Sequence, residues 1–345
     1  MLISFTDKGL YCEPGNFYID PWKPVETAVI THAHSDHART GHKHYLCHHH
    51  SKPLLRSRLG ENNYQSLDWN DPVTRNGVRV SLHPAGHIIG SSQVRVEFKG
   101  EIWVVSGDYK TADDGISGGF EPVRCHTFIT ESTFGLPVYQ WKPQESIYAD
   151  MRNWIKRNQE EGFSSVFHAY SLGKAQRILD ALHDFEGKIF LHDAVWKIQH
   201  ALLSAGWKFP KAEHMTANTK AELRRGSIYI TPTSIEQTPV AKLIGPYRTA
   251  SCSGWMQVRG NQRRSSTDAV FVLSDHADWN GLLSAVEATG AEKVFVTHGF
   301  QSVFSHYLNE KGISAGEVKT NFGEEDEETA SQLNSIKSTA SDAEG

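Results

Sequence analysis

The stretch Thr31-His32-Ala33-His34-Ser35-Asp36-His37 places three imidazoles and one carboxylate within six positions, directly after an apolar run. Residues two apart on an extended segment point the same way, so His32 and His34 can reach one metal ion together. As the chain turns, Asp36 and His37 are carried toward a second ion. Imidazole and carboxylate ligands suit zinc, and catalytic zinc sites keep a position open for water. The stretch therefore predicts a catalytic zinc centre at a strand end.

Three further residues of the same ligand types stand alone, each near the end of a β-rich run. His87 lies among small residues that permit close backbone approach, Asp108 follows the run 102–106, and His298 follows the run 293–297. With Asp108 shared, they complete four ligands for each of two ions. The other histidines near the first stretch lack this spacing and are interpreted as ordinary surface residues: His42, His44, His48, His49 and His50.

The order of β-rich and helical segments indicates an inserted domain. β-rich runs occupy both ends of the sequence, at 17–20, 27–31, 78–82, 93–98, 102–106, 269–273 and 293–297. Apolar residues at three- and four-residue intervals predict helices at 145–159, 173–183 and 279–289. The β-rich ends and the more helical middle are typical of one domain interrupted by another.

Charge is unevenly distributed along the chain. The net charge of −5 divides into −2 for residues 1–136, +7 for 137–265, −4 for 266–323 and −6 for 324–345. A positive surplus confined to one segment is expected of a surface that contacts a phosphate backbone, although basic residues that merely solvate helices would give the same sum. The acidic tail at 324–345 has few apolar residues, so we expect it to be disordered.

Composition and cysteine usage narrow the class of protein. Apolar residues make up 39% of the chain, which is a globular composition, and no stretch approaches the roughly 20 apolar residues that a membrane helix needs. The first residues lack the layout of a secretory signal. The four cysteines are scattered, which indicates neither a disulfide framework nor a thiolate zinc site. We therefore expect a cytoplasmic protein without a membrane partner.

The order of these motifs resembles the metallo-β-lactamase superfamily, and three more segments resemble its β-CASP nucleases. Residues 130–135 are similar to the acidic motif A, 274–278 to the motif B histidine, and 296–299 to motif C in its histidine form. Two segments in the middle, 169–176 and 251–256, also resemble β-CASP sequences. The resemblance implies a metallo-β-lactamase αββα fold built from residues 1–136 and 266–323, with a β-CASP insertion at 137–265.

The resemblance also assigns roles to the metal ligands. It implies a first zinc bound by His32, His34, His87 and Asp108, and a second bound by Asp36, His37, Asp108 and His298. The ligand types favour zinc and also admit manganese. Asp20 matches a carboxylate that orients ligand histidines.

Three residues are expected to act on the reacting groups. Two metal ions can activate water and neutralise charge on a phosphodiester. His276 is the expected general acid for the leaving alkoxide, Glu131 would hold its imidazole, and Asp36 would also orient the nucleophile. In the insertion, a helix N-terminus and a turn indicate phosphate contacts, with plain capping as the alternative, at Ser171, Gly173, Lys174, Arg177, Ser253 and Gly254.

Within the family, the pattern is most similar to bacterial exonucleases associated with an ATP-dependent DNA ligase and a helicase in the DNA-damage response. It implies a two-zinc DNA exonuclease acting in repair on single-stranded or end-bearing DNA, with that ligase and helicase as partners. An RNA-processing ribonuclease stays open as the main alternative. A small-molecule zinc hydrolase would not need Glu131, His276 or a basic insertion, and a non-catalytic nucleic-acid-binding subunit would be expected to have lost ligands.

Overall fold

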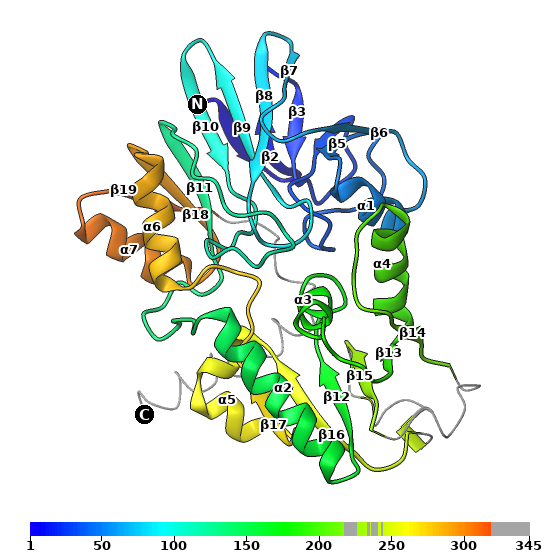
Figure 1. Cartoon of the computed structure of the whole chain (residues 1–345). Helices are drawn as coiled ribbons and strands as arrows, with labels where there is room; N and C mark the ends of the chain where they lie inside the picture. Colours follow the sequence, from blue (N-terminus) through cyan, green and yellow to red (C-terminus); the bar gives the residue numbers. More distant parts are fainter. Residues whose placement is uncertain (217–225, 233–234, 236–240, 243, 319–345) are drawn as a thin grey trace. The chain divides into compact units, whose positions relative to one another are not determined.

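The computed structural model describes residues 1–216, 226–232, 235, 241–242 and 244–318 (Figure 1). The predicted acidic tail lies outside these residues. Contacts within the chain define two compact units: unit 1 consists of Met1–Pro137 and His276–Gly345, and unit 2 of Val138–Asp275. The two ends of the sequence thus build one unit, and the middle builds the other.

Unit 1 contains two β-sheets. The six-stranded sheet has the order β1 (Ile3–Thr6), β2 (Gly9–Cys12), β3 (Phe17–Ile19), β4 (Thr27–Val29), β5 (His44–His48) and β6 (Tyr64–Leu67). The seven-stranded sheet has the order β19 (Ser314–Glu317), β18 (Lys293–Gly299), β11 (Thr127–Ser132), β10 (Glu101–Val105), β9 (Ser92–Phe98), β8 (Val78–Pro84) and β7 (Pro72–Arg75).

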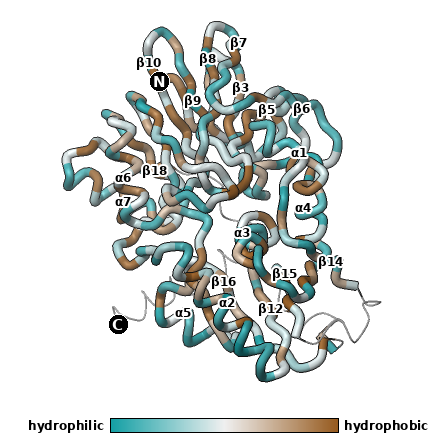
Figure 2. The backbone as a smooth tube through the Cα atoms, viewed as in Figure 1, coloured by the Kyte–Doolittle hydropathy of each residue, from teal (hydrophilic) through white to brown (hydrophobic). Residues whose placement is uncertain are grey.

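The main core of unit 1 lies between these sheets. Ile19 and Val29 from one sheet pack with Val80 and Val94 from the other. Strand residues alternate between the two faces of a sheet, so one face of each strand supplies this core. Helices α6 (Trp279–Thr289) and α7 (Gln301–Glu310) cover the opposite face of the seven-stranded sheet, and α1 (Ser51–Leu59) packs against β5. The predicted αββα layering is confirmed, and Figure 2 shows hydrophobic residues recurring along the strands.

Five strands of the seven-stranded sheet, including β19 parallel to β18, end at the same edge. Strand β11 pairs in parallel with both β10 and β18, whereas β9 is antiparallel to both β8 and β10. Strands β8, β10, β11, β18 and β19 therefore all run in one direction. Side chains that sit at or just beyond their C-terminal ends are brought to one edge, which is where ligands commonly bind in α/β proteins.

Unit 2 is built on a parallel sheet that the sequence did not predict. Its order is β14 (Glu213–His214), β13 (Ile189–Leu191), β15 (Ile228–Thr231), β12 (Ser164–His168), β16 (Tyr247–Cys252) and β17 (Ala269–Phe271). The helices of this unit are α2 (Gln144–Glu160), α3 (Lys174–Ala181), α4 (Asp193–Ser204) and α5 (Arg259–Arg264). Among the central strands, β15 is buried along its whole length and β12 at every residue except His168, so they lack the polar alternation that marks a strand in sequence.

The last strand of unit 2 is β17. It falls within the β-rich run predicted at 269–273 and pairs with β16. By its contacts, unit 2 ends at Asp275. Among the described residues, no helix has both the length and the apolar character needed to cross a bilayer. The four cysteines are buried thiols.

Candidate metal centre

Seven side chains gather at the strand ends of unit 1 in three overlapping groups, and a fourth group joins Asp108 to Glu131 and His276. In each group, one ligand atom per residue lies within 4.8 Å of all the others. The three overlapping groups are His32 with His34, His87 and Asp108; His37 with Asp108 and His298; and His32 with Asp36 and His37. The structure thus brings together every residue that the sequence nominated as a metal ligand, and it places Asp36 in the group of His32 and His37.

Asp108 lies between two sets of imidazoles, one facing each oxygen. Its Oδ2 is 3.5 Å from Nε2 of His32 and 3.7 Å from Nε2 of His87. Its Oδ1 is 2.9 Å from Nε2 of His298 and 3.5 Å from Nε2 of His37. A carboxylate that presents separate oxygens to separate pairs of imidazoles has the geometry of a bridging ligand.

The spacing of these atoms suits ions of the size of zinc. Zinc bonds of about 2.0–2.1 Å at tetrahedral angles hold ligand atoms about 3.3–3.4 Å apart. The separations around Asp108 bracket that value, and Nδ1 of His34 is 3.0 Å from Nε2 of His87. Within the described residues, the buried Nε2 of His32 has no hydrogen-bond partner. A bound cation would satisfy that nitrogen, so the residues present fit a metal centre.

Burial and neighbouring charges adjust the protonation of the cluster. Burial, together with nearby imidazoles, holds the pKa of His32 well below its ordinary value, which favours the neutral form that binds metals. Burial lowers the pKa of His37, but Asp36 and Asp108 raise it more, so it ends well above the ordinary range. Burial raises the pKa of Asp108, yet His37 and His298 bring it well below. The Asp108 carboxylate is thus ionised and the His32 imidazole neutral, which are the forms that bind a metal ion.

Asp20 binds the ring nitrogen of His37 that does not face Asp108. Its Oδ2 lies 2.7 Å from Nδ1 of His37, and its Oδ1 accepts the backbone N–H of Thr31 at 2.8 Å. Burial raises the pKa of Asp20, partly offset by His37 and Thr31. The residue has a positive φ of 43°, a conformation that non-glycine residues rarely adopt. The carboxylate fixes the orientation of the His37 ring and leaves Nε2 directed at Asp108.

His276 and Glu131 form a pair beside the cluster. Nδ1 of His276 lies 3.0 and 3.1 Å from the two carboxylate oxygens of Glu131. Glu131 is fully buried and also accepts the backbone N–H groups of Tyr109 at 2.8 Å and Thr133 at 3.2 Å. The His276 ring is 18% exposed and its centroid is 4.5 Å from that of His87. The imidazole therefore has one nitrogen held by a fixed carboxylate and partial access to solvent.

Two glycines next to ligands could not carry a side chain. Gly86, before His87, has φ +75°, and a Cβ there would lie 2.4 Å from the carbonyl oxygen of Lys110. Gly299, after His298, has φ +77°, and its Cβ would lie 2.2 Å from the carbonyl oxygen of Ser132. Both positions need a left-handed backbone and close approach, which only glycine tolerates.

Two supporting residues were missed from the sequence. Thr31 donates from its hydroxyl to Asp20, and its Oγ1 lies 3.0 Å from Nδ1 of His32. Its position directly before His32 was the available signal. Arg58, on α1, donates to the carbonyl oxygen of Ala33 inside the ligand-bearing loop. Nothing in the local sequence links Arg58 to that loop, because the contact spans 25 positions.

The predicted phosphate contacts of unit 2 lie in capping arrangements. The backbone N–H of Gly173, at the start of α3, donates to Gln176 Oε1 at 2.8 Å, and Gln176 Nε2 donates to the carbonyl of Ser171 at 3.2 Å. Ser253 Oγ accepts a backbone N–H at 3.4 Å from the turn that Gly254 begins. These hydrogen bonds are those of ordinary helix capping.

The two basic residues predicted to contact phosphate are bound to protein groups. Nη1 of Arg177 lies 2.9 Å from Oδ1 of Asp275, and Nη2 donates to Gln144 at 2.6 Å. Nζ of Lys174 is 3.4 Å from Oδ2 of Asp275. The Arg177 side chain is only 2% exposed, and its guanidinium binds groups inside unit 2. The sequence had predicted a contact with substrate for this residue.

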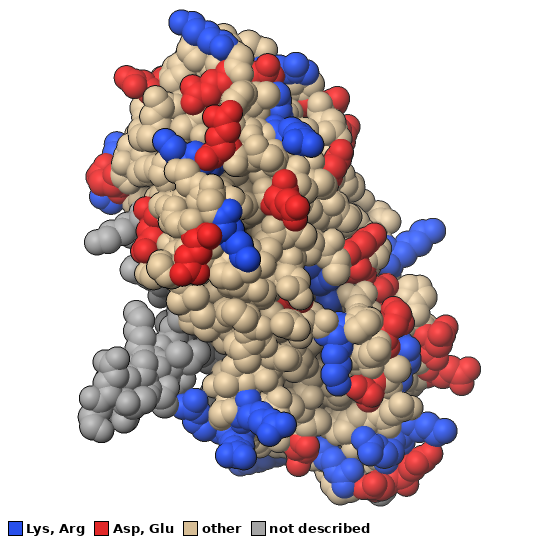
Figure 3. All heavy atoms as spheres, turned by 90° about the vertical axis from the view of Figure 1, so that its left-hand side faces the viewer, with Lys and Arg blue, Asp and Glu red and all other residues tan. Residues whose placement is uncertain are grey.

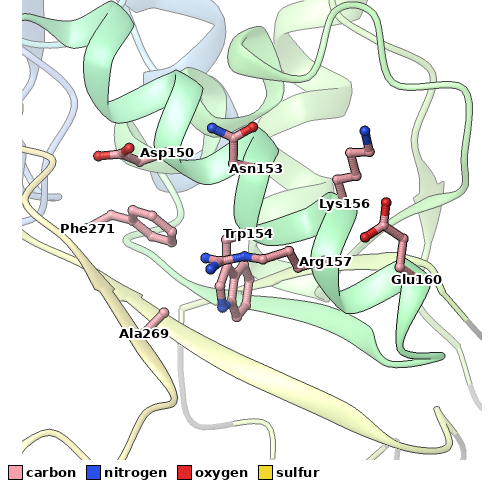
Figure 4. A pocket seen from close by; sticks show the side chains of 8 residues that line it. All are labelled: Asp150, Asn153, Trp154, Lys156, Arg157, Glu160, Ala269 and Phe271. Atoms are coloured by element: carbon pink, nitrogen blue, oxygen red, sulfur yellow. The ribbon is translucent and has the colours of Figure 1, made fainter.

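A surface hollow of about 600 Å³ in unit 2 is separate from the residues of the cluster (Figure 4). Its floor is apolar, and its rim holds two acidic and two basic side chains, so it has no net charge to attract a polyanion. It is lined by Asp150, Asn153, Trp154, Lys156, Arg157, Glu160, Ala269 and Phe271.

Comparison with known proteins gives relatives of two kinds. The chain is 31% identical to a Probable DNA ligase of Opitutus terrae, over 89% of this chain and 30% of that protein. It is 27% identical to Endoribonuclease ysh-1 of Neurospora crassa, over 36% of this chain and 15% of that protein. It is 23% identical to an RNase J-like protein of Methanocaldococcus jannaschii, over 57% of this chain and 54% of that protein. The chain therefore spans well under two thirds of these relatives.

A solved structure shares the fold. A crystal structure from Enterococcus faecalis V583, described as a protein of unknown function, matches with a TM-score of 0.56 and 11% identity, over 85% of this chain and 79% of that chain. No family model matches the sequence.

The αββα layers, with a buried histidine and aspartate cluster at their strand ends, define a class of metal-dependent hydrolases. Relatives that include a Probable DNA ligase, an endoribonuclease and an RNase J-like protein specify the class further. The chain belongs to the metallo-β-lactamase/β-CASP nuclease family.

Proposed function

We propose that the protein is a two-zinc phosphodiesterase that hydrolyses DNA, acting as an exonuclease in DNA repair. The observation that carries the proposal is Asp108, whose two oxygens each face a separate pair of imidazoles, next to the His276–Glu131 pair. DNA is favoured because the relative aligned over 89% of the chain is a Probable DNA ligase. That relative also supports a DNA ligase as a partner, with a helicase proposed from the family resemblance.

The ligand residues would divide between two ions. His32, His34, His87 and Asp108, which form one group in the structure, would hold the first. The group of His37, Asp108 and His298, joined by Asp36, would hold the second. When bound, two such ions supply charge stabilisation for a phosphodiester and activation of water; manganese suits the same ligands. Asp36 is proposed to orient the attacking water as well. Asp20 would keep the His37 ring in position.

His276 is proposed as the general acid. With Nδ1 bound to Glu131, Nε2 is the nitrogen that would give a proton to the leaving oxygen as the phosphorus–oxygen bond breaks. Water adds its oxygen to phosphorus as the bond to the leaving oxygen breaks, its proton passes to solvent, and His276 regains a proton from solvent, so atoms and charge balance. Glu131 is itself fixed by backbone N–H groups, which limits rotation of the imidazole.

Unit 1 is proposed to be the metallo-β-lactamase domain and unit 2 the β-CASP domain. The positive surplus of residues 137–265 supports a nucleic-acid contact in unit 2. Figure 3 shows lysine and arginine side chains gathered on unit 2, over the face with α2 and α5, with acidic side chains among them. Helix α5 alone contributes Arg259, Arg263 and Arg264. Ser171, Gly173, Ser253 and Gly254 remain proposed substrate contacts.

An RNA-processing ribonuclease is the second candidate. It is favoured by the matches to Endoribonuclease ysh-1 and to the RNase J-like protein. We also propose a cytoplasmic location for the protein. The four buried thiols, which form no disulfide, support it, and no helix among the described residues is able to cross a bilayer.

Matched single-stranded DNA and RNA of one sequence, labelled at either end, test the proposal. We expect metal-dependent release of mononucleotides from DNA, with RNA cleaved more slowly. Faster cleavage of RNA would favour the second candidate. Hydrolysis of neither polymer by the metal-loaded protein, alongside turnover of a lactone or thioester, would overturn the nuclease proposal.

A further inference from the structure

A buried ion pair in unit 2 ends on the residue just before His276. Oδ1 of Asp275 accepts a hydrogen bond from Nη1 of Arg177 at 2.9 Å, and Oδ2 lies 3.4 Å from Nζ of Lys174. The side chains of Arg177 and Asp275 are 2% and 1% exposed. Arg177 also donates to the carbonyl oxygen of Ser274. Two cations of α3 therefore hold both the carboxylate and the backbone of this segment.

The buried pair of Arg177 and Asp275 is better suited to fixing the direction of the chain at Asp275 than to stabilising the folded protein. Burying a charged pair costs desolvation energy that roughly cancels its attraction, so such pairs contribute little net stability. The planar guanidinium of Arg177 reaches a carbonyl and a carboxylate through one nitrogen, and Gln144 through the other. A group bound at several points in a rigid fork restricts the direction of the chain that it holds.

The chain is also held on the other side of the Asp275–His276 peptide bond. Nδ1 of His276 lies 3.0 Å from Oε1 of Glu131, and the backbone N–H of Ala277 donates to the carbonyl oxygen of Tyr109 at 2.6 Å. At this bond the chain leaves unit 2 and enters unit 1. The proton donor of the proposed reaction is thus the first residue after the Arg177–Asp275 pair.

We propose that Arg177, Lys174 and Asp275 are positioning residues for His276: they fix the chain immediately before it and so restrict its imidazole to the orientation that protonates the leaving oxygen. The inference rests on the proposed function of His276. Proton transfer requires the acid within about 2.6–3.2 Å of its target, and a displacement of about 1 Å can cost on the order of 100-fold in rate. The basic residues of α3 thereby act on catalysis through Asp275.

Substrates with different leaving groups separate this role from a structural one. A DNA oligonucleotide loses a basic alkoxide that needs a proton, whereas a p-nitrophenyl phosphodiester loses a stable phenolate that does not. We expect Asp275→Asn to slow DNA cleavage by about 10–100-fold in kcat, with little change in KM. The p-nitrophenyl rate should stay within about threefold, and metal content should be unchanged. Arg177→Met should likewise slow DNA cleavage more than p-nitrophenyl release. Arg177→Lys should keep part of the DNA cleavage that Arg177→Met loses.

His276→Ala provides the reference. It should show the same dependence on the leaving group, and adding Asp275→Asn to it should cause no further loss, because residues that act through one group are not additive. Arg248→Met is the matched control, since it removes another arginine–carboxylate pair of unit 2, to Glu161 at 2.6 Å. It should leave the ratio of the two rates unchanged.

The outcomes distinguish the inference from the proposed function. Absence of leaving-group dependence in His276→Ala would remove that residue as the acid. If the rate depends on the leaving group in His276→Ala but not in Asp275→Asn, the positioning role alone is overturned. An equal loss of rate on both substrates in Asp275→Asn would overturn it too. If Asp275→Asn does not fold, Lys174→Met supplies the same comparison. It leaves the pair of Arg177 and Asp275 intact, so it should fold. It should shift the ratio of the DNA rate to the p-nitrophenyl rate in the same direction.

Discussion

Replacement of Asp108 by Ala is the most direct test of the metal centre. The residue presents Oδ2 to His32 and His87 and Oδ1 to His37 and His298, at separations of 2.9–3.7 Å. It is the one described side chain that the structure places in both the four-residue group and the group with His298. Removing it should therefore weaken both sites, whereas loss of a histidine should weaken one.

The magnitude follows from the charge that the site must stabilise. A metal ion contributes several kcal/mol to stabilising charge in the transition state, and each 1.4 kcal/mol corresponds to about tenfold in rate. Loss of about 4 kcal/mol thus predicts a fall in kcat of about a thousandfold. Metal content should drop from two ions per chain to one or fewer.

Metal content is measured by elemental analysis after gel filtration, with turnover of a chromogenic phosphodiester on the same samples. Asp113→Ala is the control, because Asp113 lies on an exposed loop and its Oδ1 accepts only a local backbone N–H of Gly115 at 2.8 Å among the described contacts. Circular dichroism should report folded protein for both variants. Full metal content with ordinary turnover in Asp108→Ala would refute the bridging role.

Three further changes test other parts of the site. His276→Ala should give folded, metal-loaded protein whose DNA cleavage falls about 10²–10⁴-fold; an unchanged rate would exclude it as the acid. Asp20→Asn should weaken metal binding about 10–100-fold in a chelator competition, because the His37 ring loses its charged partner; equal affinity would contradict that role. His42 and His48 are buried, not on the surface as the sequence indicated. Burial lowers the pKa of His42 from 6.5 to about 4, and its Nδ1 accepts the N–H of Val25. Below about pH 6.5 His42 becomes protonated in the unfolded chain but stays neutral in the folded protein. Its contribution should therefore lower the free energy of unfolding by up to about 1.4 kcal/mol per pH unit, until about pH 4. Urea unfolding of His42→Gln should show a flatter pH dependence, and identical slopes would refute the assignment.

Much of unit 1 could be predicted from sequence because its signals are local. The runs near β8 and β9 alternate apolar and polar residues, and the helix predicted at 279–289 has the bounds of α6. Strand β12 and its neighbours in unit 2 were missed, since a short buried parallel strand has no periodicity of its own. Its pairing partners lie far along the chain, and only packing reveals them.

The sequence by itself determined which side chains are available for chemistry: the three imidazoles and one carboxylate after β4, and the lone His87, Asp108 and His298 at later strand ends. Residue type and spacing suffice for that, because ligand chemistry belongs to the side chain. Tertiary structure alone decided that each oxygen of Asp108 faces a different pair of imidazoles, and that Arg177 pairs with Asp275. Those outcomes depend on distances between segments separated by tens of residues, which chain folding sets and local pattern does not encode.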